Sequence, residues 1–350
     1  MADLIEGLET FAEVTWDFKE FWNMENSYDI VHIHWPEYLS FEIESYLKTT
    51  EPLPQALWQN LEVCLNYWSK HTTIVYTRHV RAPHGRDDEE FKKLYCKVFG
   101  YCKAMTHFAE FSVEQYYSYF PGIKVPIHRV IPQHKHTSLP NTSNRQSARK
   151  ALGIEPDAKV LLCFGTIKEN EKAFIKKTYH AITAKPKVLL APGWKVNRRK
   201  IGYIRLREWV WKLEQWWVSK NQSFRINLGF ITEDEAHLYC NAADVLLIPR
   251  TDELFSGNIS LAFSFGLVVL GKDDSNIGEI LEKYHNPTFK VGDMNSMEKS
   301  INQAFQLAQT SLGAKNKQVA DSIWSIENTI KRYKSFYNDA IKVKTKKGSI

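Results

Sequence analysis

The sequence lacks any hydrophobic run that approaches the length of a membrane-spanning helix. Such a helix needs about 20 consecutive apolar residues, and every apolar run in this 350-residue chain is shorter. The five cysteines form no closely spaced pairs, so we expect free thiols in a reducing cytoplasm. The first ten residues carry Asp3, Glu6 and Glu9, whereas a secretory signal would be basic and then apolar. These absences argue against membrane-spanning, disulfide-stapled and secreted proteins.

A strong excess of charge is also missing. The formal net charge is +6, which suits phosphate-bearing ligands or an anionic membrane surface and is weaker than a nucleic-acid-binding domain usually shows. The chain is rich in apolar residues, at 43% hydrophobic and 13% aromatic with 11 Trp. That composition and length are sufficient for the cores of two globular domains.

Short apolar runs recur along the chain and often end in glycine or proline. Because they show no clean alternation of apolar and polar residues, they predict parallel strands covered on both faces. Amphipathic helical stripes lie between them, so the sequence predicts an α/β fold with doubly wound sheets. The strand runs are Thr72–Thr77, Lys159–Gly165, Lys187–Gly193, Arg225–Phe230, Asp244–Pro249 and Leu267–Gly271. Two of the helical stripes are Leu206, Val210, Leu213 and Trp217, and Val319, Ile323, Ile326, Ile330 and Tyr333.

A polar stretch, residues 133–147, is typical of an interdomain linker because it contains Pro140 and several Ser, Thr and Asn residues. It predicts a domain over residues 1–140 and a second over residues 141–325. Residues 326–350 are predicted to form a C-terminal helix with a basic tail.

The first candidate site follows the predicted strand that begins at Lys159. This strand ends at Gly165, and the loop after it carries Lys168 and Lys172. Open α/β sheets bind ligands beyond the carboxyl ends of their strands, where a glycine lets the backbone approach phosphate and lysines add positive charge. The alternative is a solvated surface loop.

The second candidate site lies after the strand that ends at Pro249. Arg250 and Glu253 follow, and then a turn, Ser256–Gly257–Asn258, precedes a predicted helix. Amides at a helix N-terminus bind anions, whereas a carboxylate such as Glu253 would suit sugar hydroxyls. The alternative is that Ser256 or Asn258 only caps the helix.

The third candidate site is in the N-terminal half, where "DIVHIHWPE" brings His34, Trp35 and Glu37 to the end of a strand. "TRHVRAPHG" brings His79 and His84 to the end of another. Trp35 offers a flat face for a sugar ring, and a carboxylate or imidazole can deprotonate a hydroxyl. The alternatives are core histidines, above all for His32, and a metal site. The metal site is disfavoured because no ligand set has metal spacing.

Taken in order, these motifs resemble those of GT-B glycosyltransferases. The C-terminal half resembles glycosyltransferase family four through "FGTIKENEK", "GFITEDEAHLYCNAADVLLIPR", "ELFSGNISLAFSFG" and "VGD". "DIVHIHWPEYL", "TRHVRAPH" and "VIPQHKH" resemble bacterial exopolysaccharide β-mannosyltransferases, which use GDP-mannose and a lipid-linked oligosaccharide. The resemblance implies two Rossmann-like domains with parallel sheets facing across a cleft. The C-terminal domain would hold the nucleotide-sugar and the N-terminal domain the acceptor.

Residue roles follow from the same resemblance. Gly165 and Lys168 would face the diphosphate, Glu253 would contact the transferred sugar, and Ser256–Gly257–Asn258 would present amides to phosphate. We also expect Lys172 and Arg250 on the donor side, and His34 and Trp35 on the acceptor side. If the reaction inverts the anomeric centre, one of Glu37, His79 and His84 would be the base.

The chain departs from the family pattern at several positions. The second glutamate of family four, which contacts the ribose, is replaced by Leu261. The usual arginine after the glycine is Thr166 and the usual lysine is Glu171, so Lys168 and Lys172 would have to compensate. The chain also opens in what looks like the helix after a first strand and glycine-rich loop. The first βα unit is therefore expected to be missing.

The sequence thus predicts a cytoplasmic, metal-independent glycosyltransferase with no cofactor, acting in bacterial polysaccharide synthesis. The donor would be a nucleoside diphosphate hexose, with GDP-mannose favoured, and the acceptor a glycan or lipid-linked oligosaccharide. Contact with the inner face of an anionic membrane is suggested by the basic tail and by basic residues 198–207 beside Trp194 and Trp209. The alternatives are a non-catalytic sugar-nucleotide or glycan binding protein and, more weakly, a GT-B epimerase or phosphorylase.

Overall fold

The structure, a computed structural model, describes the whole chain except residues 82–85, 195–212, 214–222, 228–230 and 348–350. The chain divides into two compact units. Unit 1 combines residues 1–134 with residues 325–350 and a short segment, residues 253–255. Unit 2 contains residues 135–252 and 256–324. The linker prediction had set the boundary between the two parts at residue 140.

Unit 1 is built on a four-stranded sheet in which all strands are parallel, in the order β1-β2-β3-β4. The register pairs Ile33 with Tyr76 and Thr77 with Thr106, so the carboxyl ends of β1, β2 and β3 lie at one edge. The strands are β1 (Ile30–Ile33), β2 (Thr73–Thr77), β3 (Ala104–His107) and β4 (Ile127–Val130).

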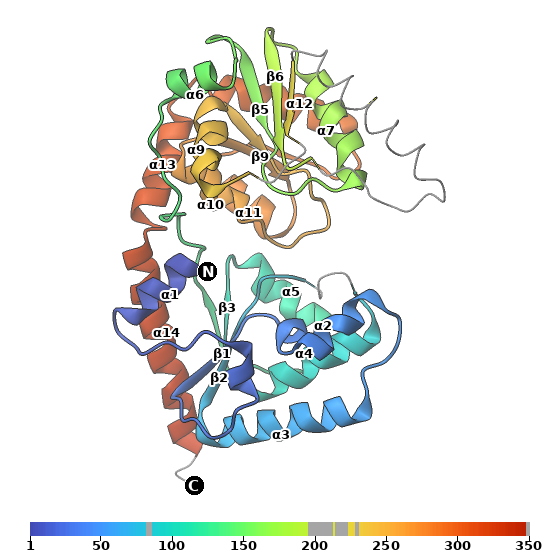
Figure 1. The fold of residues 1–350 in the computed structure, drawn as a ribbon, viewed down its shortest axis with the longest axis vertical. Helices are drawn as coiled ribbons and strands as arrows, with labels where there is room; N and C mark the ends of the chain where they lie inside the picture. Colours follow the sequence, from blue (N-terminus) through green and yellow to red (C-terminus); the bar gives the residue numbers. More distant parts are fainter. Residues whose placement is uncertain (82–85, 195–212, 214–222, 228–230, 348–350) are drawn as a thin grey trace. The chain divides into compact units, whose positions relative to one another are not determined.

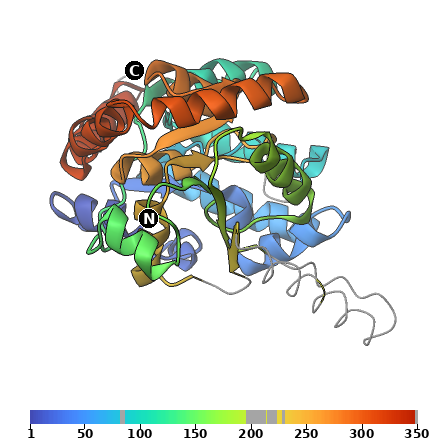
Figure 2. The same ribbon diagram turned by 90° about the horizontal axis from the view of Figure 1, so that it is seen from above.

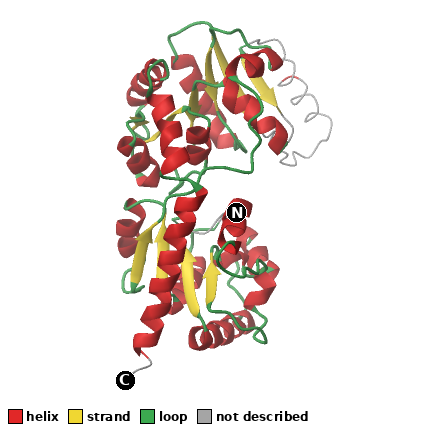
Figure 3. Cartoon of the chain, turned by 90° about the vertical axis from the view of Figure 1, so that its left-hand side faces the viewer, coloured by secondary structure: helices red, strands yellow, loops and turns green. Residues whose placement is uncertain are grey.

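Helices cover both faces of this sheet. Successive strand residues point to opposite faces, so Ile74 and Tyr76 pack with Trp68, whereas Val75 packs with Phe336. One face is covered by α3 (Gln55–His71) and α4 (Glu89–Tyr101), and the other by α1 (Ala2–Glu9) and α14 (Ile326–Lys347). Figures 1 and 3 show α14 running along the strands. The other helical segments are η1 (Phe18–Phe21), η2 (Pro36–Tyr38), α2 (Phe41–Ser45), η3 (Tyr46–Lys48) and α5 (Phe111–Tyr119).

Unit 2 contains a six-stranded parallel sheet with the order β10-β9-β8-β5-β6-β7. The strand order reverses between β5 and β8, and such a switch point is where open α/β sheets bind ligands. The strands are β5 (Lys159–Leu162), β6 (Lys187–Pro192), β7 (Phe224–Asn227), β8 (Val245–Leu247), β9 (Val268–Lys272) and β10 (Thr288–Phe289).

The core of unit 2 forms where helices pack on this sheet. Ile175 and Tyr179 of α7 and Ile301 and Phe305 of α12 belong to one buried cluster with Leu161 of β5. The two helices lie side by side, as Figures 1 and 2 show. The helices are α6 (Arg145–Ala151), α7 (Glu169–Ala181), α9 (Glu233–Ala242), α10 (Asn258–Ser264), α11 (Ser275–Lys283), α12 (Met294–Leu307) and α13 (Leu312–Ser322).

The predicted α/β class with two parallel sheets is confirmed. The apolar stripe from Val319 to Tyr333 is not one helix, however, because α13 ends at Ser322 and α14 begins at Ile326. Ser325 lies in the break, and its hydroxyl accepts a hydrogen bond from the Asn328 N–H at 3.3 Å, so it caps the new helix. The helix predicted over 206–217 falls almost entirely outside the described residues. Among those described, no helix is long and apolar enough to cross a membrane.

Candidate functional site

The donor-side motif of unit 2 begins where the loops after β5 and β6 run side by side and pair through Ile167 and Trp194. Gly165 and Gly193 both have positive φ angles, of 89° and 84°, which only glycine adopts without strain. The Ile167 N–H donates to the Gly193 carbonyl oxygen at 3.0 Å. A Cβ atom on Gly193 would collide with the carbonyl oxygen of Gly165. Glycine is therefore required at the carboxyl end of these two strands, where the backbone is tightly folded.

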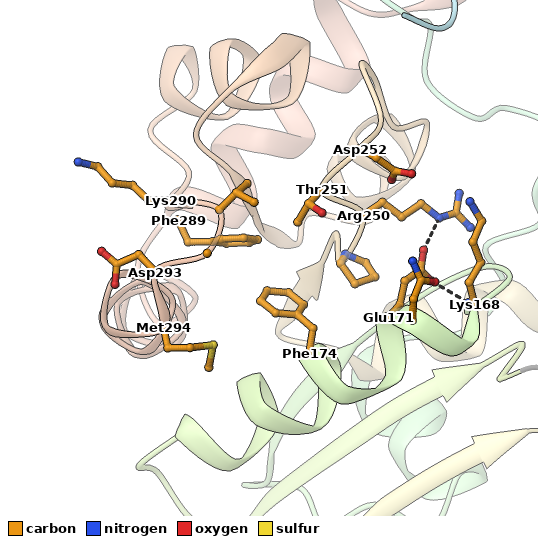
Figure 4. A pocket seen from close by; sticks show the side chains of 14 residues that line it. Lys168, Glu171, Phe174, Arg250, Thr251, Asp252, Phe289, Lys290, Asp293 and Met294 are labelled. Carbon is orange, nitrogen blue, oxygen red and sulfur yellow. Dashed lines mark hydrogen bonds and ion pairs between the residues drawn. The ribbon is translucent and has the colours of Figure 1, made fainter. Parts of the chain in front are cut away.

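An ion pair fixes the start of α7 to the loop after β8 (Figure 4). Glu171, only 6% exposed, accepts the Lys168 backbone N–H at 2.8 Å with one carboxylate oxygen and the Arg250 Nε at 3.0 Å with the other. Arg250 also donates to the Thr166 carbonyl oxygen at 2.6 Å. Glu171 of α7 thus holds Arg250 of the loop after β8 in place. Arg250 itself remains about 28% exposed.

A pocket of about 360 Å³ lies beside this ion pair. Figure 4 shows Phe174 and Phe289 facing each other within it, with ring centroids 5.2 Å apart, and Lys168 and Arg250 on one side. Lys290 also belongs to its lining. Such a pocket can hold a ligand that is part anion and part flat ring. Its lining carries three cations, Lys168, Arg250 and Lys290, and three carboxylates, Glu171, Asp252 and Asp293.

The turn before α10 lies at the same edge of the sheet. The Asn258 side-chain amide donates to the Phe164 carbonyl oxygen at 3.0 Å, which ties the turn to the loop that carries Gly165. Gly257 is the N-cap residue of α10, and Ser256 is buried. The structure therefore places six of the predicted donor-side residues in loops at one edge of the sheet, and two of them, Lys168 and Arg250, line the pocket. The other four are Gly165, Ser256, Gly257 and Asn258.

Two other predicted donor-side residues are placed differently. Lys172 is only 6% exposed, its Nζ pairs with Glu169 at 2.9 Å, and it lies 5.3 Å from the centre of the Trp194 ring. It is absent from the pocket lining described above. Glu253 belongs to unit 1, together with residues 254 and 255, and not to the unit that holds the other donor-side residues.

In unit 1, three of the predicted acceptor-side residues meet. His34 Nδ1 and His79 Nε2 are 2.8 Å apart and share a hydrogen bond. The Trp35 ring stacks on His79 with centroids 4.3 Å apart. His84 lies outside the described residues. The sequence prediction that these strand ends converge is therefore met by His34, Trp35 and His79.

His32 extends this cluster into the core. Its Nε2 is 2.7 Å from the Thr77 hydroxyl and its Nδ1 is 2.8 Å from the Tyr337 hydroxyl, so both ring nitrogens are hydrogen-bonded. This is the satisfied histidine that the alternative interpretation predicts. Desolvation lowers the pKa of His32 well below its usual value and that of His34 to about 3. Both imidazoles are therefore neutral at pH 7.

Glu37 occupies a different environment from the histidines. It lies in η2, is fully buried, and accepts a hydrogen bond of 2.6 Å from the Tyr95 hydroxyl. Tyr95 comes from α4, so the pair links the segment after β1 to a core helix. This burial favours the alternative that Glu37 stabilises the loop, and it leaves His79 as the better-placed candidate base among the described residues.

No cluster of three or more His, Cys, Asp or Glu residues with the geometry to hold a metal ion occurs in the part of the chain that the structure describes. The basic residues 198–207 predicted to contact a membrane lie outside that part. Trp194 is 1% exposed and packs beneath Lys172 and Lys176, so its ring is not available to a membrane surface.

Some pocket residues were missed by sequence reasoning. Phe174, Phe289 and Lys290 line the donor-side pocket, but none was selected from the sequence. Helical spacing offers a signal for Phe174, because it lies three residues after Glu171 on the same face of α7. For Lys290 the signal was its position immediately before the "VGD" motif.

Comparison with known proteins relates the chain to solved structures by fold. No protein-family model and no curated protein matches the sequence. Sucrose-phosphate synthase from Thermosynechococcus elongatus matches with a TM-score of 0.64 and 17% identity, over 97% of this chain and 79% of that one. Anabaena HepE in complex with UDP and glucose matches with a TM-score of 0.64 and 12% identity, over 92% and 81%.

A trehalose-phosphate synthase from Burkholderia xenovorans matches with a TM-score of 0.59 and 9% identity, over 92% of this chain and 76% of that one. These neighbours are GT-B glycosyltransferases, and this chain has the GT-B fold. At these identities the likeness describes the fold alone, and the chemistry has to be argued from the residues of the chain.

Proposed function

We propose that the protein is a glycosyltransferase that moves a hexose from a nucleoside diphosphate sugar to a glycan or lipid-linked oligosaccharide acceptor. The observation that carries this proposal is the pocket at the switch point of unit 2. Lys168 and Arg250 line it, and the Gly165 loop and the turn before α10 lie at the same edge. Parallel α/β sheets bind nucleotides at such a position.

The contacts of Arg250 support a role in diphosphate recognition. A guanidinium that is held by a buried carboxylate and a backbone carbonyl is preorganised, so little conformational entropy is lost when it also binds an anion. Lys168 is the N-cap residue of α7, and the helix N-terminus adds favourable potential for negative charge. Anabaena HepE, a structural neighbour, is known in complexes with UDP and with UDP-glucose.

For the donor sugar, mannose from GDP-mannose is the choice that the N-terminal motifs favour. It would place the protein in bacterial polysaccharide synthesis. A UDP-hexose is the second choice. The binding experiment below identifies the nucleobase, because each nucleoside diphosphate is offered separately. The turnover experiment with the nucleotide-sugars identifies the sugar.

In the proposed reaction, an acceptor hydroxyl oxygen forms a bond to the anomeric carbon, and the bond from that carbon to the diphosphate oxygen breaks. Lys168 and Arg250 stabilise the negative charge that develops on the leaving diphosphate. If the reaction inverts the centre, His79 takes the hydroxyl proton, while its hydrogen bond with His34 orients its ring. In this metal-independent mechanism, Lys168 and Arg250 supply the stabilisation of the leaving diphosphate's charge.

Two observations favour a second candidate, a sugar-nucleotide binding protein without turnover. Leu261 stands where family four has a ribose-binding glutamate, and it is only 3% exposed on α10. Glu171 stands where the family has a lysine, and its carboxylate engages Arg250. Both changes concern recognition of the nucleotide rather than the acceptor.

The test measures calorimetric binding of GDP, UDP and dTDP to the full chain and then turnover of the matching nucleotide-sugars with glycan acceptors. We expect binding of one nucleoside diphosphate and release of that nucleotide from its sugar conjugate, at the same rate with and without EDTA. Binding without turnover would establish the second candidate. Absence of binding for all three nucleotides would refute both. Activity lost in EDTA and restored by magnesium or manganese would refute the metal-independent mechanism.

Peripheral contact with an anionic membrane completes the proposal for a lipid-linked acceptor. The end of α14 carries Lys342, which is exposed, and further lysines follow along the sequence. Co-sedimentation with vesicles of anionic lipid at low salt tests this contact, and vesicles of neutral lipid are the control.

A further inference from the structure

The pocket of unit 2 contains a carboxylate that the proposed function does not use, that of Asp252. The other two carboxylates of the lining are engaged. Glu171 is paired with Arg250, and Asp293 accepts two backbone N–H groups at the start of α12, at 2.9 and 3.0 Å. Asp252 is exposed, and within the described part of the chain it forms no hydrogen bond or ion pair. Its carboxylate is therefore available to a ligand.

The backbone that leads to Asp252 is anchored on both sides of the loop. Arg250 is bound to Glu171 and to a backbone carbonyl, as described above. The Thr251 carbonyl oxygen accepts a hydrogen bond at 2.9 Å from the Nζ of Lys272, which is only 4% exposed. Because the two residues before Asp252 are held, its carboxylate is presented from a fixed position, and less conformational entropy is lost when a ligand binds.

The polar and aromatic groups of this pocket follow one another in a definite order. Figure 4 shows Lys168 and Arg250 at one end, with Asp252 beside them. Thr251 lies between that end and the aromatic pair, of which Phe174 is half-buried. A nucleoside diphosphate has the same order, with a dianionic diphosphate, then ribose, then a flat base. With phosphate at the two cations and the base on Phe174, the ribose would lie beside Thr251 and Asp252.

The other pocket, in unit 1, does not offer such a site. It has a volume of about 480 Å³ and lies along β1, but no lysine or arginine lines it. The helix α10, which begins at the same edge of the sheet as the unit 2 pocket, carries no acidic residue, and Leu261 within it is 3% exposed. A carboxylate for the ribose therefore has to come from the loop after β8.

We propose that Asp252 binds the ribose hydroxyls of the nucleoside diphosphate. The 2′- and 3′-hydroxyls are neighbouring donors, and a carboxylate can accept a hydrogen bond from each with its two oxygens. This inference rests on the proposed function, because it takes the ligand of the unit 2 pocket to be a nucleoside diphosphate. It adds the residue that distinguishes a ribonucleotide from a deoxyribonucleotide.

Two other roles for Asp252 are less consistent with this arrangement. The transferred hexose also has hydroxyls, but it is attached to the opposite end of the diphosphate from the ribose. With the base on Phe174, the hexose would lie beyond Lys168 and Arg250, away from Thr251. A carboxylate that met no hydroxyl would only repel the diphosphate, and this alternative predicts the opposite sign in the experiment below.

The test measures calorimetric binding of GDP and 2′-deoxy-GDP, and of UDP and 2′-deoxy-UDP, to the full chain. In the pair that binds, we expect the ribonucleotide to bind at least about tenfold more tightly, which is the scale of one hydrogen bond to a charged group. Asp252→Asn should weaken the ribonucleotide and leave the deoxyribonucleotide unchanged or stronger, so that the preference falls below about threefold. Because Asp252 is exposed and asparagine has the same size, this variant is expected to fold.

Asp157→Asn is the matched control and should retain the preference. Asp157 is exposed and outside the pocket lining, and it comes just before β5, at the amino edge of the same sheet. It removes the same charge from the same unit.

Several outcomes would overturn the assignment. Equal affinities of the wild-type chain for the two forms would do so. Tighter binding of both forms to Asp252→Asn, with the preference unchanged, would show that the carboxylate only repels phosphate. Weaker binding of the nucleotide-sugar alone, with the free nucleoside diphosphate unaffected, would assign Asp252 to the hexose.

The proposed function can fail separately. An Asp252-dependent preference for the ribonucleotide, without turnover of any nucleotide-sugar, would leave the ribose site standing and remove the transferase. Turnover with no such preference would leave the transferase and remove the ribose site. Absence of binding for all four nucleotides would overturn both.

Discussion

The pocket described in unit 2 and the pocket described in unit 1 differ in the charged groups of their linings. The pocket of unit 2, about 360 Å³, is lined by three cations and three carboxylates, and one of the cations, Arg250, is held in an ion pair with buried Glu171. The pocket of unit 1, about 480 Å³, has carboxylates, neutral histidines and aromatic rings, with no lysine or arginine in its lining. Both lie beside parallel sheets of the same class, so the fold does not set this difference.

The contrast shows that the side chains on the loops, and not the sheets, assign a ligand to each unit. The unit 2 pocket offers Lys168, Arg250 and Lys290 to an anion, whereas the lining of the unit 1 pocket contains no lysine or arginine. Substitutions in unit 2 should therefore weaken binding of the nucleoside diphosphate, and substitutions in unit 1 should leave that binding unchanged. The following predictions test this separation, from the largest expected effect to the smallest.

Replacement of His79 should give the largest effect and should be confined to turnover. His79→Ala removes the proposed base, so kcat should fall by roughly 10²–10⁴ while nucleoside diphosphate affinity is unchanged. Steady-state kinetics and calorimetry measure the two quantities. His71→Ala, at an exposed histidine of α3, is the control. A parallel loss of nucleotide affinity would contradict the separation, and a retaining reaction would leave kcat much less affected.

Arg250→Met should weaken nucleoside diphosphate binding by about 100-fold, or about 3 kcal/mol, because it removes a charge-assisted contact and the cation that faces buried Glu171. Binding of the free nucleoside should not change. Lys299→Met, at an exposed lysine of α12, controls for loss of general positive charge. If Arg250→Met weakened nucleoside and nucleoside diphosphate equally, Arg250 would be a structural residue only.

Glu37→Gln should lower the free energy of unfolding by about 1–3 kcal/mol, because it alters a fully buried hydrogen bond from Tyr95. Tyr95→Phe removes the other partner and should have a similar effect. Urea denaturation measures stability, and turnover is measured per folded molecule. Unchanged stability with kcat reduced 10²–10⁴-fold would instead support the catalytic role predicted for Glu37 from the sequence.

Unit 1 should lose stability in mild acid. Burial lowers the pKa of His34 to about 3 and that of His107 to about 2, and burial with help from Arg78 lowers that of His128 to about 4. Since an unfolded histidine titrates near 6.5, the unfolded state binds more protons below that pH. This stabilisation is present above about pH 6.5 and is lost progressively as the pH falls towards 4. Each such histidine contributes a slope of up to about 1.4 kcal/mol per pH unit.

Hydrogen exchange at pH 8, 6 and 4.5, resolved by peptide, measures this effect in each unit. His128→Asn should reduce the pH dependence of the protection free energy in unit 1 peptides by the contribution of one histidine. Equal loss of protection in both units, with no change in His128→Asn, would show that these histidines do not set the acid response.

The sequence predicted many of the strands and the convergence of His34 and His79, because both depend on local patterns, but β3, β4 and β10 were not predicted. Val188–Pro192 is an uninterrupted apolar run, and His34 and His79 each follow a run that ends at the same edge. Parallel pairing then brings them together whatever the details of packing.

Residue roles that depend on distant partners could not be predicted in this way. Glu37 follows a strand like a ligand-binding residue, but Tyr95, which buries it, is 58 residues away in the sequence. Lys172 lies one residue past Glu171, and one residue rotates a helix by about 100°, so its side chain reaches Trp194 instead of the pocket. Once the start of α7 is known, that rotation follows from the spacing. Asp252 lies in a loop with no periodic signal.

The path of the chain has a consequence for how the protein is made on the ribosome. Unit 2 is nearly continuous in sequence, so it can fold as soon as residues 135–324 have emerged. The sheet of unit 1 is synthesised before unit 2, yet one of its faces is covered by α14, which follows unit 2 in the sequence. The apolar residues of that face, Val75 and Ala104 among them, cannot be covered by α14 until it has emerged. Chaperones that shield such surfaces should therefore bind the nascent chain most strongly while unit 2 is being synthesised.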